Sequence, residues 1–511
     1  MAILFLCPKL PLFYHLCVIY VASALTIKKI FIKNLPLYAE LRDNKIEPKK
    51  YFFASTERKE VFIKKTKQKI TRKDIREHLV QFHLACELVK VIRHFFPDLI
   101  PNLKQIKDPR NRSYIKYEQH VLLMTKILSS IFYISSMRKT SEEFNNETAI
   151  KNIGILCGRE ELEELPYWET INRYLERLEP EELQKTVCRL VGRLIRSRAF
   201  EKGRMRERYW QIIVDGTQLE SSRKELDKKS LYRVHKKGTA EEYREYYYYV
   251  LEAKLLLHEK IVVSIMTEFV ENEGSETEKQ DCERKACFRL MERLKREFPM
   301  LPICMCGDSL YACERFFREC GKKKWHFLLR FKEGSIPTVY KEYKTLKEEE
   351  RNRREWETEK ETLCYDYVNK IDYNGIGLNF VEYEEKEKAT GNVGRFYFLT
   401  DFQVSQKNVR RLVEEGRRRW KIENEGFNTQ KQQGYYLEHM YSRNYQAMKN
   451  HYYLIQIGHM ISQVMEAWEK LWKKVKQSRE QKHRRLLESW KQEKLEEYSE
   501  EMEKAIQIRL G

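Results

Sequence analysis

The chain has 511 residues, of which 42% are hydrophobic and 12% aromatic, enough for two to four domains with sizeable cores. With only 19 Gly and 12 Pro it is neither collagen-like nor of low complexity, and its aromatic content argues against disorder throughout. Lys and Arg number 97 against 77 Asp and Glu, and the resulting charge of +20 favours a polyanionic partner, most simply nucleic acid, over a merely basic soluble protein.

The only long apolar stretch lies near the N-terminus, from Leu10 to Thr26. It is shorter than the about 20 residues that a membrane-spanning helix needs. Lys28 and Lys29 follow it, whereas the charges of a signal peptide precede its apolar region. We therefore expect no stable membrane association and interpret residues 1–50 as an N-terminal extension, with a membrane anchor as the alternative.

Twelve cysteines are scattered along the chain without a CxxC pair, so neither a zinc ribbon nor a redox dithiol is indicated. Cys304 and Cys306 alternate within an apolar run, and alternate residues of a strand share one face. We expect both in the core rather than on a metal. Free cysteines in a large basic protein fit a reducing cytoplasm.

Residues 51–205 are predicted to form a helical region. Apolar residues recur at helical spacing over residues 71–96, and two short helices meet near Pro180. Arg173, Arg177 and further basic residues accompany these short helices. The pattern fits a helical DNA-binding region, and a plain helical scaffold is the alternative.

Strand patterns begin near residue 209 and indicate an α/β region over residues 206–335. Strands cluster first and then alternate with helices, which is typical of a mixed α/β domain. The predicted strands cover residues 209–216, 244–257, 259–272, 301–309 and 324–331, and the predicted helices cover residues 278–298 and 313–320.

Three further segments complete the chain. Residues 336–402 alternate between apolar and polar side chains and carry two turn signals, so we expect a β-rich insertion. The pattern over residues 403–465 is mainly helical. The charged tail, residues 466–511, is expected to be an amphipathic helix that is solvated or packs on a partner.

Two aspartates follow directly after apolar strands. Asp215 follows the run 210–214, and Asp308 follows the run 303–307. A carboxylate at the end of a buried strand is held rigidly at the edge of the sheet, where α/β proteins place ligand and metal sites. A turn or a helix cap explains either residue taken alone.

A third carboxylate lies on the predicted helix 417–431. Its residues Arg419, Glu423, Phe427 and Lys431 follow one another at intervals of four and so lie close to one face. In the functional interpretation Glu423 points at a metal, Phe427 packs it in place and the two basic side chains hold phosphates. The alternative is an exposed helix with an ion pair between Arg419 and Glu423. Its apolar residues Trp420 and Ile422 predict that one side packs on the core.

Two Asp and one Glu suit a metal centre for phosphodiester chemistry. Two Mg²⁺ ions about 3.5–4 Å apart activate the attacking oxygen and stabilise the leaving oxygen. Mg²⁺ takes hard oxygen ligands, whereas histidines and thiolates favour softer metals. Asp215, Asp308 and Glu423 are therefore the expected ligands of two Mg²⁺ ions, for which Mn²⁺ can substitute.

At these residues the chain resembles the DDE transposases of bacterial insertion sequences, in the large branch with a ribonuclease-H-like core. The matching segments are IIVDGTQL around Asp215, CGDSLYA around Asp308 and RRWKIENEGFNTQK around Glu423. The likeness covers about residues 160–465. It implies an α/β fold with a ribonuclease-H-like mixed-sheet core, interrupted by the β-rich insertion and flanked by the helical N-terminal region and the helical tail.

The likeness has two departures in the family's signature helix, which carries Tyr, Arg, Glu and Lys at set spacings. RWKIE supplies the Arg and the Glu in register, but Gly416 stands at the Tyr position. The Lys position falls on Gln430, with Lys431 one place later. Glu425 competes with Glu423 as the third carboxylate. We prefer Glu423 because its offset from Trp420 and Ile422 matches that of the family's signature helix.

The resemblance implies a transposase that binds the terminal inverted repeats of its element and catalyses metal-dependent cleavage and strand transfer. Asp215, Asp308 and Glu423 would be catalytic metal ligands. The expected phosphate contacts are Arg330, Lys332, Arg419 and Lys431. The implied partner is double-stranded DNA, at the element ends and at the target. The implied assembly is a DNA-bound homodimer, in the bacterial cytoplasm at the nucleoid.

Two rival functions stay open on the sequence. One is a transposase-derived protein that binds DNA without catalysis, and the other is a nuclease of the same fold without strand transfer. The tyrosines Tyr246 to Tyr249 suggest base stacking, but a strand that alternates between core and surface explains them as well.

Overall fold

The computed structural model describes residues 82–272, 282–472, 477–504 and 506. All described residues belong to one unit, Ile70–Gly511. The apolar stretch near the N-terminus and the expected extension lie outside the described residues. Within the described ranges, none of the helices has the length and apolar character needed to cross a membrane.

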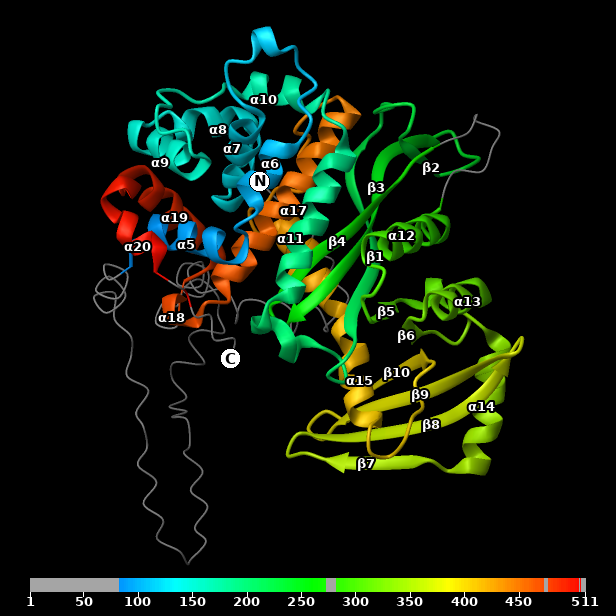
Figure 1. The fold of residues 1–511 in the computed structure, drawn as a ribbon. Helices are drawn as coiled ribbons and strands as arrows, with labels where there is room; N and C mark the ends of the chain where they lie inside the picture. The colour runs from blue at the N-terminus through cyan, green and yellow to red at the C-terminus, as the bar shows by residue number, and fades with distance from the viewer. Residues whose placement is uncertain (1–81, 273–281, 473–476, 505, 507–511) are drawn as a thin grey trace, which may run out of the picture. The chain divides into compact units, whose positions relative to one another are not determined.

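The N-terminal part of the described chain is helical, as predicted (Figure 1). Its elements are α5 (Leu84–Phe95), α6 (Leu99–Gln105), η2 (Arg112–Tyr114), α7 (Gln119–Ile131), α8 (Met137–Phe144), α9 (Glu147–Cys157), α10 (Trp168–Leu175), α11 (Pro180–Arg196) and η3 (Arg198–Gly203). Side-chain caps begin α8 and α9, where Ser136 and Asn146 accept hydrogen bonds from backbone amides in the first turn. Pro180 opens α11, a position where its missing N–H costs nothing.

The C-terminal tail forms several short helices rather than one long one. After α17 (Tyr445–Glu466) come α18 (Glu469–Trp472), α19 (Arg479–Gln492), η7 (Leu495–Tyr498) and α20 (Ser499–Glu503). α19 lies against α5 and α9, and the indole of Trp490 is fully buried there. The tail therefore closes the helical core, although its sequence is dominated by charged residues.

A ten-stranded mixed sheet forms the centre of the described unit, so the prediction of a mixed α/β fold is confirmed. The strands are β1 (Trp210–Ser222), β2 (Leu231–His235), β3 (Tyr243–His258), β4 (Ile261–Val270), β5 (Ile303–Gly307), β6 (His326–Phe331), β7 (Arg353–Glu357), β8 (Glu361–Tyr373), β9 (Ile376–Glu387) and β10 (Val393–Thr400). They lie in the order β2-β3-β1-β5-β6-β10-β9-β8-β7, and β4 also pairs with β3. β1, β5 and β6 run parallel, whereas β3, β4 and β10 pair antiparallel with their neighbours.

Helices cover both faces of this sheet. The covering segments are α12 (Glu283–Glu297) and α13 (Glu314–Lys323) on one face, and α15 (Val409–Arg417), η5 (Arg418–Trp420), η6 (Ile422–Phe427) and α16 (Asn428–Gln432) on the other. We call these the α12 face and the α15 face. Because side chains alternate along a strand, Ile212 belongs to the α12 face and Ile213 to the α15 face. Cys304 and Cys306 are buried on the α15 face, which confirms them as core residues.

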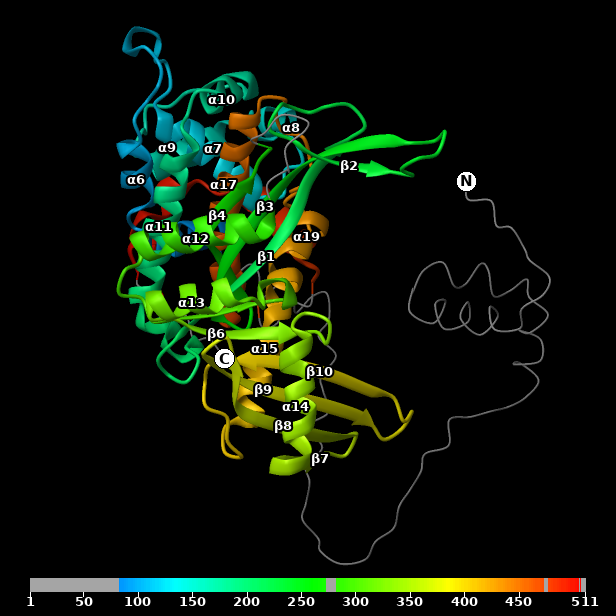
Figure 2. The ribbon, with the colours of Figure 1, turned by 90° about the vertical axis from the view of Figure 1, so that its right-hand side faces the viewer.

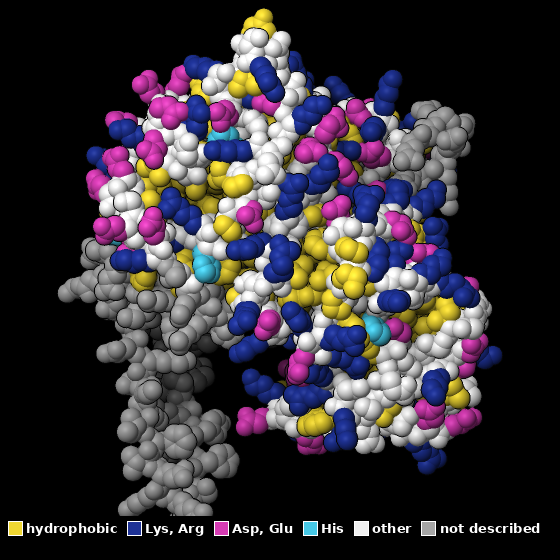
Figure 3. Space-filling model, viewed as in Figure 1, with side chains coloured by type: hydrophobic (Ala, Val, Ile, Leu, Met, Phe, Trp, Pro, Cys, Tyr) yellow, Lys and Arg dark blue, Asp and Glu magenta, His cyan; other side chains and the backbone are white. Residues whose placement is uncertain are grey.

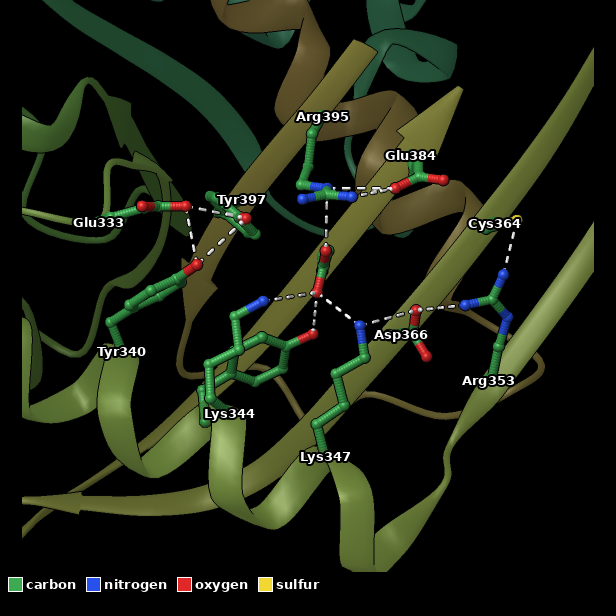
Figure 4. A network of polar contacts seen from close by, with 12 residues as sticks. Glu333, Tyr340, Lys344, Lys347, Arg353, Cys364, Asp366, Glu384, Arg395 and Tyr397 are labelled. Carbon is green, nitrogen blue, oxygen red and sulfur yellow. Dashed lines mark hydrogen bonds and ion pairs between the residues drawn. The ribbon is translucent and has the colours of Figure 1, made fainter. Parts of the chain in front are cut away.

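The segment expected as a β-rich insertion contains β7 to β10 and one helix, α14 (Pro337–Glu350). Its strands extend the central sheet instead of forming a sheet of their own, because β10 pairs with β6. A buried carboxylate, Glu382 of β9, joins α14 to this sheet: it accepts hydrogen bonds from Tyr343 and Lys347 at 2.6 and 2.7 Å. Figure 4 shows the surrounding polar network, in which Arg395 of β10 also reaches Glu384. The charged sequence of α14 thus serves to attach the helix to the sheet.

Candidate active site

Asp215 and Asp308 lie level with each other on neighbouring parallel strands. The register pairs Ile213 of β1 with Cys306 of β5, and each aspartate stands two residues further along its chain. Strand alternation places Asp215 on the α15 face together with Ile213, and Asp308 follows β5 directly at the same edge. The structure therefore brings the first two predicted carboxylates to one place, at the carboxyl edge of β1 and β5.

The surroundings of the two aspartates differ. Asp215 Oδ1 accepts the backbone N–H of Gly216 at 3.0 Å, and Arg419 Nη1 donates to Asp215 Oδ2 at 3.3 Å. Burial raises the pKa of Asp215 to about 6; the charge of Arg419 opposes this, and the nearby carboxylates of Glu283 and Asp308 add to it. Asp308 caps a short 3₁₀ turn by accepting the N–H of Leu310 at 2.8 Å. The site thus concentrates negative charge, which a bound cation would offset.

Glu283, at the start of α12, is a fourth carboxylate at this edge and is not predicted from the sequence. Its two carboxylate oxygens accept hydrogen bonds from the hydroxyls of Tyr249, at 2.7 Å, and Tyr311. Both tyrosine rings pack on glycines that neighbour the aspartates: a Cβ on Gly216 would lie 2.2 Å from Tyr249 Oη, and one on Gly307 would lie 2.6 Å from the Tyr311 ring. Gly216 and Gly307, each next to one of the aspartates, therefore leave space for the two tyrosines that hold Glu283.

No spacing in the sequence marks Glu283, because a helix start joins the site only once α12 has packed on the sheet. The one available signal is the pair of glycines. Each lies next to an aspartate at the end of a strand, where a missing side chain indicates close approach of another group.

Glu423 lies on η6, which contacts β1 and β4 on the α15 face. η6 is a π-helix, a rare form that often occurs at functional sites. It is anchored by the buried Ile422 and Phe427, and Gly426 allows it to approach the sheet, since a Cβ there would meet the stem of the buried Lys254 at 3.2 Å. Phe427 thus packs the segment in place, as expected.

The neighbours of Glu423 are engaged in other ways. Arg479 of α19 pairs with Glu425 at 3.0 Å, so that carboxylate is engaged by the C-terminal tail. Within the described part of the chain Glu423 is without an ion-pair partner, and Arg419 pairs with Asp215 instead of Glu423. The regular spacing of four is broken because the segment runs through 3₁₀, π and α turns. Trp420, expected in the core, is 49% exposed and stacks with Arg419.

The four predicted phosphate contacts fall in different places. Arg330, at the end of β6, lies near Arg419: burial lowers its pKa, and the charge of Arg419 lowers it further. Lys332 is exposed just beyond β6. Lys431 pairs with Glu438 at 2.9 Å and faces a cavity of about 1060 Å³ on the side of η6 that carries Glu425. Of the four, Arg419 contacts Asp215 and Arg330 lies near Arg419.

The two departures from the signature helix have structural reasons. Gly416 is buried against Phe398, whose ring would lie 2.6 Å from a Cβ, so a tyrosine does not fit there. Gln430 is fully buried and donates to Gln456 at 2.7 Å and contacts His459 at 2.8 Å, so it belongs to a core amide network. Neither residue faces the aspartates.

The donor chemistry of the site fits Mg²⁺, but the ligands are not gathered into a finished metal site. Hard carboxylate oxygens converge at the edge, and their mutual repulsion favours a bound cation. Among the residues that the structure describes, no three His, Cys, Asp or Glu side chains are arranged to hold a metal ion. The ion pair of Arg419 with Asp215 occupies one of the expected ligands.

Comparison with known proteins leaves the family open: the chain matches no protein-family model and no curated protein.

Proposed function

We propose that the protein is a DNA transposase of the DDE type, which cleaves and joins the ends of its element with the help of Mg²⁺. The observation that carries the proposal is the level placement of Asp215 and Asp308 on adjacent parallel strands, on the edge beside η6. Glu423 is the third carboxylate in this proposal. It is not engaged by an ion pair in the described residues, whereas Glu425 is held by Arg479.

The strand order supports a ribonuclease-H-like core. β1, β3 and β4 form an antiparallel meander, and β5 and β6 add in parallel on the other side of β1, which gives the order β4-β3-β1-β5-β6. Helices lie on both faces of these strands. The β-rich segment enters between β6 and α15, the position that the resemblance assigns to the insertion.

The roles of the side chains follow from their places. Asp215, Asp308 and Glu423 would hold the two ions, and bound Mg²⁺ supplies an activated oxygen nucleophile and charge for the leaving oxygen. Arg419, released from Asp215 when a cation binds there, would bind a phosphate oxygen of the DNA. Arg330 would add positive charge beside it. Glu283 orients the edge through its two tyrosines without being a ligand in this proposal.

The proposed partner is double-stranded DNA, and the proposed assembly is a homodimer, because one reaction must hold two ends. A bacterial cytoplasmic protein at the nucleoid fits this role. The helices of the N-terminal region would contribute end binding; among them Arg173 is exposed on α10.

A second candidate is a DNA-binding remnant without catalysis. It is favoured by one observation, the absence of a gathered metal-ligand group among the described residues together with the Arg419–Asp215 ion pair. A nuclease of the same fold would share the site and differ only in failing to join DNA.

The test is cleavage of a labelled duplex that carries the inverted repeat flanking the gene, in Mg²⁺, Mn²⁺ or EDTA. Wild type runs beside Asp215→Asn, Asp308→Asn and Glu423→Gln, with Glu425→Gln as the matched control two residues away on the same segment. The proposal expects metal-dependent cutting at the end that only the control retains, and joined product when unlabelled target DNA is added.

The other outcomes separate the candidates. Binding without cutting in every metal condition contradicts the enzyme and supports the remnant. Cutting without joined product supports the nuclease. Loss of cutting in Glu425→Gln but not in Glu423→Gln would reassign the third ligand.

A further inference from the structure

One lysine lies in the interior, between the sheet and the segment that carries Glu423. Figure 3 shows Lys and Arg side chains spread over the surface of the molecule, where they are ordinarily found, because a buried ammonium group loses its hydration. Lys254 of β3 is instead fully buried. β3 lies between β1 and β4 (Figure 2), and Lys254 is level with Ile213 of β1, two residues before Asp215. A cationic side chain is therefore kept in the core next to the strand that carries Asp215.

The side chain of Lys254 contacts η6 at the end of the π turn. It lies on the α15 face, because residues that pair across two strands share a face and Ile213 belongs to that face. A Cβ on Gly426 would lie 3.2 Å from the Cδ and Cε atoms of Lys254, so the backbone of η6 rests on the lysine stem. The Nζ atom lies 5.4 Å from the ring centre of Phe427, within the range of a cation–π interaction. Phe427 follows Glu423 by four residues, about one turn, so these contacts act on the turn that carries Glu423.

The ammonium group of Lys254 is also connected to the helix that follows η6. It donates to Gln456 Oε1 at 3.0 Å. The same oxygen accepts a hydrogen bond from Nε2 of Gln430, on α16, at 2.7 Å, and Gln456 Nε2 donates in return to Gln430 Oε1 at 3.2 Å. Gln456 lies on α17, which packs on β4. Lys254 therefore joins β3 to η6 directly and to α16 through one pair of amides.

A buried carboxylate compensates the charge of Lys254. Glu252 stands two residues before Lys254 on the same face of β3 and is level with Asp215. Its carboxylate accepts hydrogen bonds from the hydroxyl groups of Ser264, Thr267 and Tyr452. Burial lowers the pKa of Lys254 to about 8, and the charge of Glu252 opposes this lowering. The ammonium form of Lys254 therefore predominates at pH 7.

We propose that Lys254 is a positioning residue for Glu423, which holds η6 in its π form on the sheet and so keeps the glutamate at the edge that carries Asp215. This inference rests on the proposed function, in which Glu423 is the third metal ligand, and adds to it the group that places this ligand. The even spacing of four in the sequence favours a regular helix and π turns are rare, so a contact from outside the segment must stabilise the π form. A buried charge is often no more stable than an apolar side chain of similar volume, so stability alone does not explain a lysine at this position.

The test removes the ammonium group and keeps the volume of the side chain. Lys254→Met fills the same space, and Gln456 Oε1 keeps its hydrogen bond from Gln430. Lys254→Met combined with Glu252→Gln removes both charges and keeps the test valid if the single variant does not fold. Lys126→Met is the matched control, because Lys126 is a buried lysine of α7 in the helical core.

Metal binding and cleavage are measured separately for each variant. Calorimetric titration follows the binding of Mn²⁺ to the protein without DNA, and cleavage of the end duplex is followed against the concentration of Mg²⁺. We expect both Lys254 variants to bind Mn²⁺ roughly tenfold more weakly and to need roughly tenfold more Mg²⁺ for half-maximal cleavage, the size of effect of a group that orients a metal ligand. The double variant should melt no lower than wild type, and the control should match wild type in both titrations.

The other outcomes overturn the inference in distinguishable ways. Dependence on Mn²⁺ and Mg²⁺ equal to that of wild type in the Lys254 variants would overturn the inference and leave the proposed function intact. An equal weakening in Lys126→Met would mean that the loss follows from removing any buried lysine, which also overturns it. If wild type neither binds Mn²⁺ nor cuts the duplex, the proposed function fails and the inference fails with it.

Discussion

At the scale of single residues, the clustered carboxylates of the candidate site destabilise the folded protein. Asp215 is 25% exposed and shares its edge with two other carboxylates, and among the described residues its one cationic partner is Arg419. Its raised pKa means that the folded protein holds the proton more tightly than the unfolded chain does. The protonated Asp215 carboxyl therefore makes its full contribution to the stability of the folded protein below about pH 4, and this contribution is lost as the pH rises through about 6.

Asp215→Asn is therefore expected to stabilise the protein in EDTA at pH 7.5, by about 1–3 kcal/mol, since two pKa units correspond to about 3 kcal/mol before solvent screening. The gain in free energy of unfolding should shrink as the pH falls from 6 toward 4. Urea unfolding at several pH values measures it, with the exposed Asp372→Asn as control. A destabilised variant at pH 7.5 would contradict the proposed charge repulsion.

Gly416 gives a second prediction at this scale. A Cβ at this position would lie 2.6 Å from the Phe398 ring, so Gly416→Ala should cost about 1–3 kcal/mol in the free energy of unfolding. Gly334→Ala is the matched control, because nothing lies within 4 Å of its Cβ. Adding Phe398→Leu should recover part of the loss. An unchanged melting temperature for Gly416→Ala would mean that α15 shifts without cost.

At the scale of elements, the sequence predicts those helices and strands that are determined by the local pattern of apolar and polar residues. The strands around Asp215 and Asp308 and the helix that became α12 were found, because runs of apolar residues end in turn signals there. The continuation of β1 to Ser222 was missed, since its polar residues pair with β3 only in the folded sheet. The π-helix around Glu423 was also missed, because an even spacing of four predicts a regular helix and only packing on Lys254 shows otherwise.

The same limit applies to the site. The two aspartates could be predicted because parallel strands bring their carboxyl ends to one edge. The ion-pair partner of Arg419 could not be predicted, because Asp215 is distant in sequence and the spacing of four along the chain favoured Glu423. The tyrosine pair on Glu283 depends on contacts between three elements and has no signature in any one of them.

Helix α7 carries a buried cation that predicts a pH dependence of stability. Lys126 is 1% exposed, its ammonium lies 4.0 Å from the Tyr441 ring centre, and burial lowers its pKa to about 7. The unfolded chain therefore binds more protons than the folded one between about pH 7 and 10.5, so stability rises across this range.

Lys126→Met should stabilise the protein by a few kcal/mol at pH 7, roughly the size expected for a shift of about three pKa units. The gain should decline toward pH 10, as the pH approaches the ordinary lysine pKa of 10.5 and the unfolded chain also begins to lose its proton. Thermal or urea unfolding at pH 7, 8.5 and 10 measures it, with the exposed Lys139→Met on α8 as control. A gain that stays constant with pH would point to packing as its cause and contradict the lowered pKa.

At the scale of the whole described unit, the N-terminal helical region and the C-terminal tail bind each other. Asn152 of α9 is fully buried and binds the C-terminal tail: its amide group donates to the carbonyls of Trp490 and Glu493 at 2.9 and 2.7 Å, and its oxygen accepts the N–H of Leu495 at 3.0 Å. These three bonds fix the point where α19 ends. They explain why a charged tail forms several helices that close the helical core.

Asn152→Ala should therefore destabilise the protein by about 2–4 kcal/mol, because it leaves two carbonyls and one N–H in the interior without partners. Asn145→Ala, two positions before α9 and exposed, is the control. Since Arg479 of α19 also donates to Thr429 and Gln433 just beyond η6, at 2.8 Å each, loosening the tail should reach the site, and Asn152→Ala should lower the cleavage rate more than its folded fraction explains. A rate that follows the folded fraction alone would show that the tail stabilises the helical core without positioning Glu423.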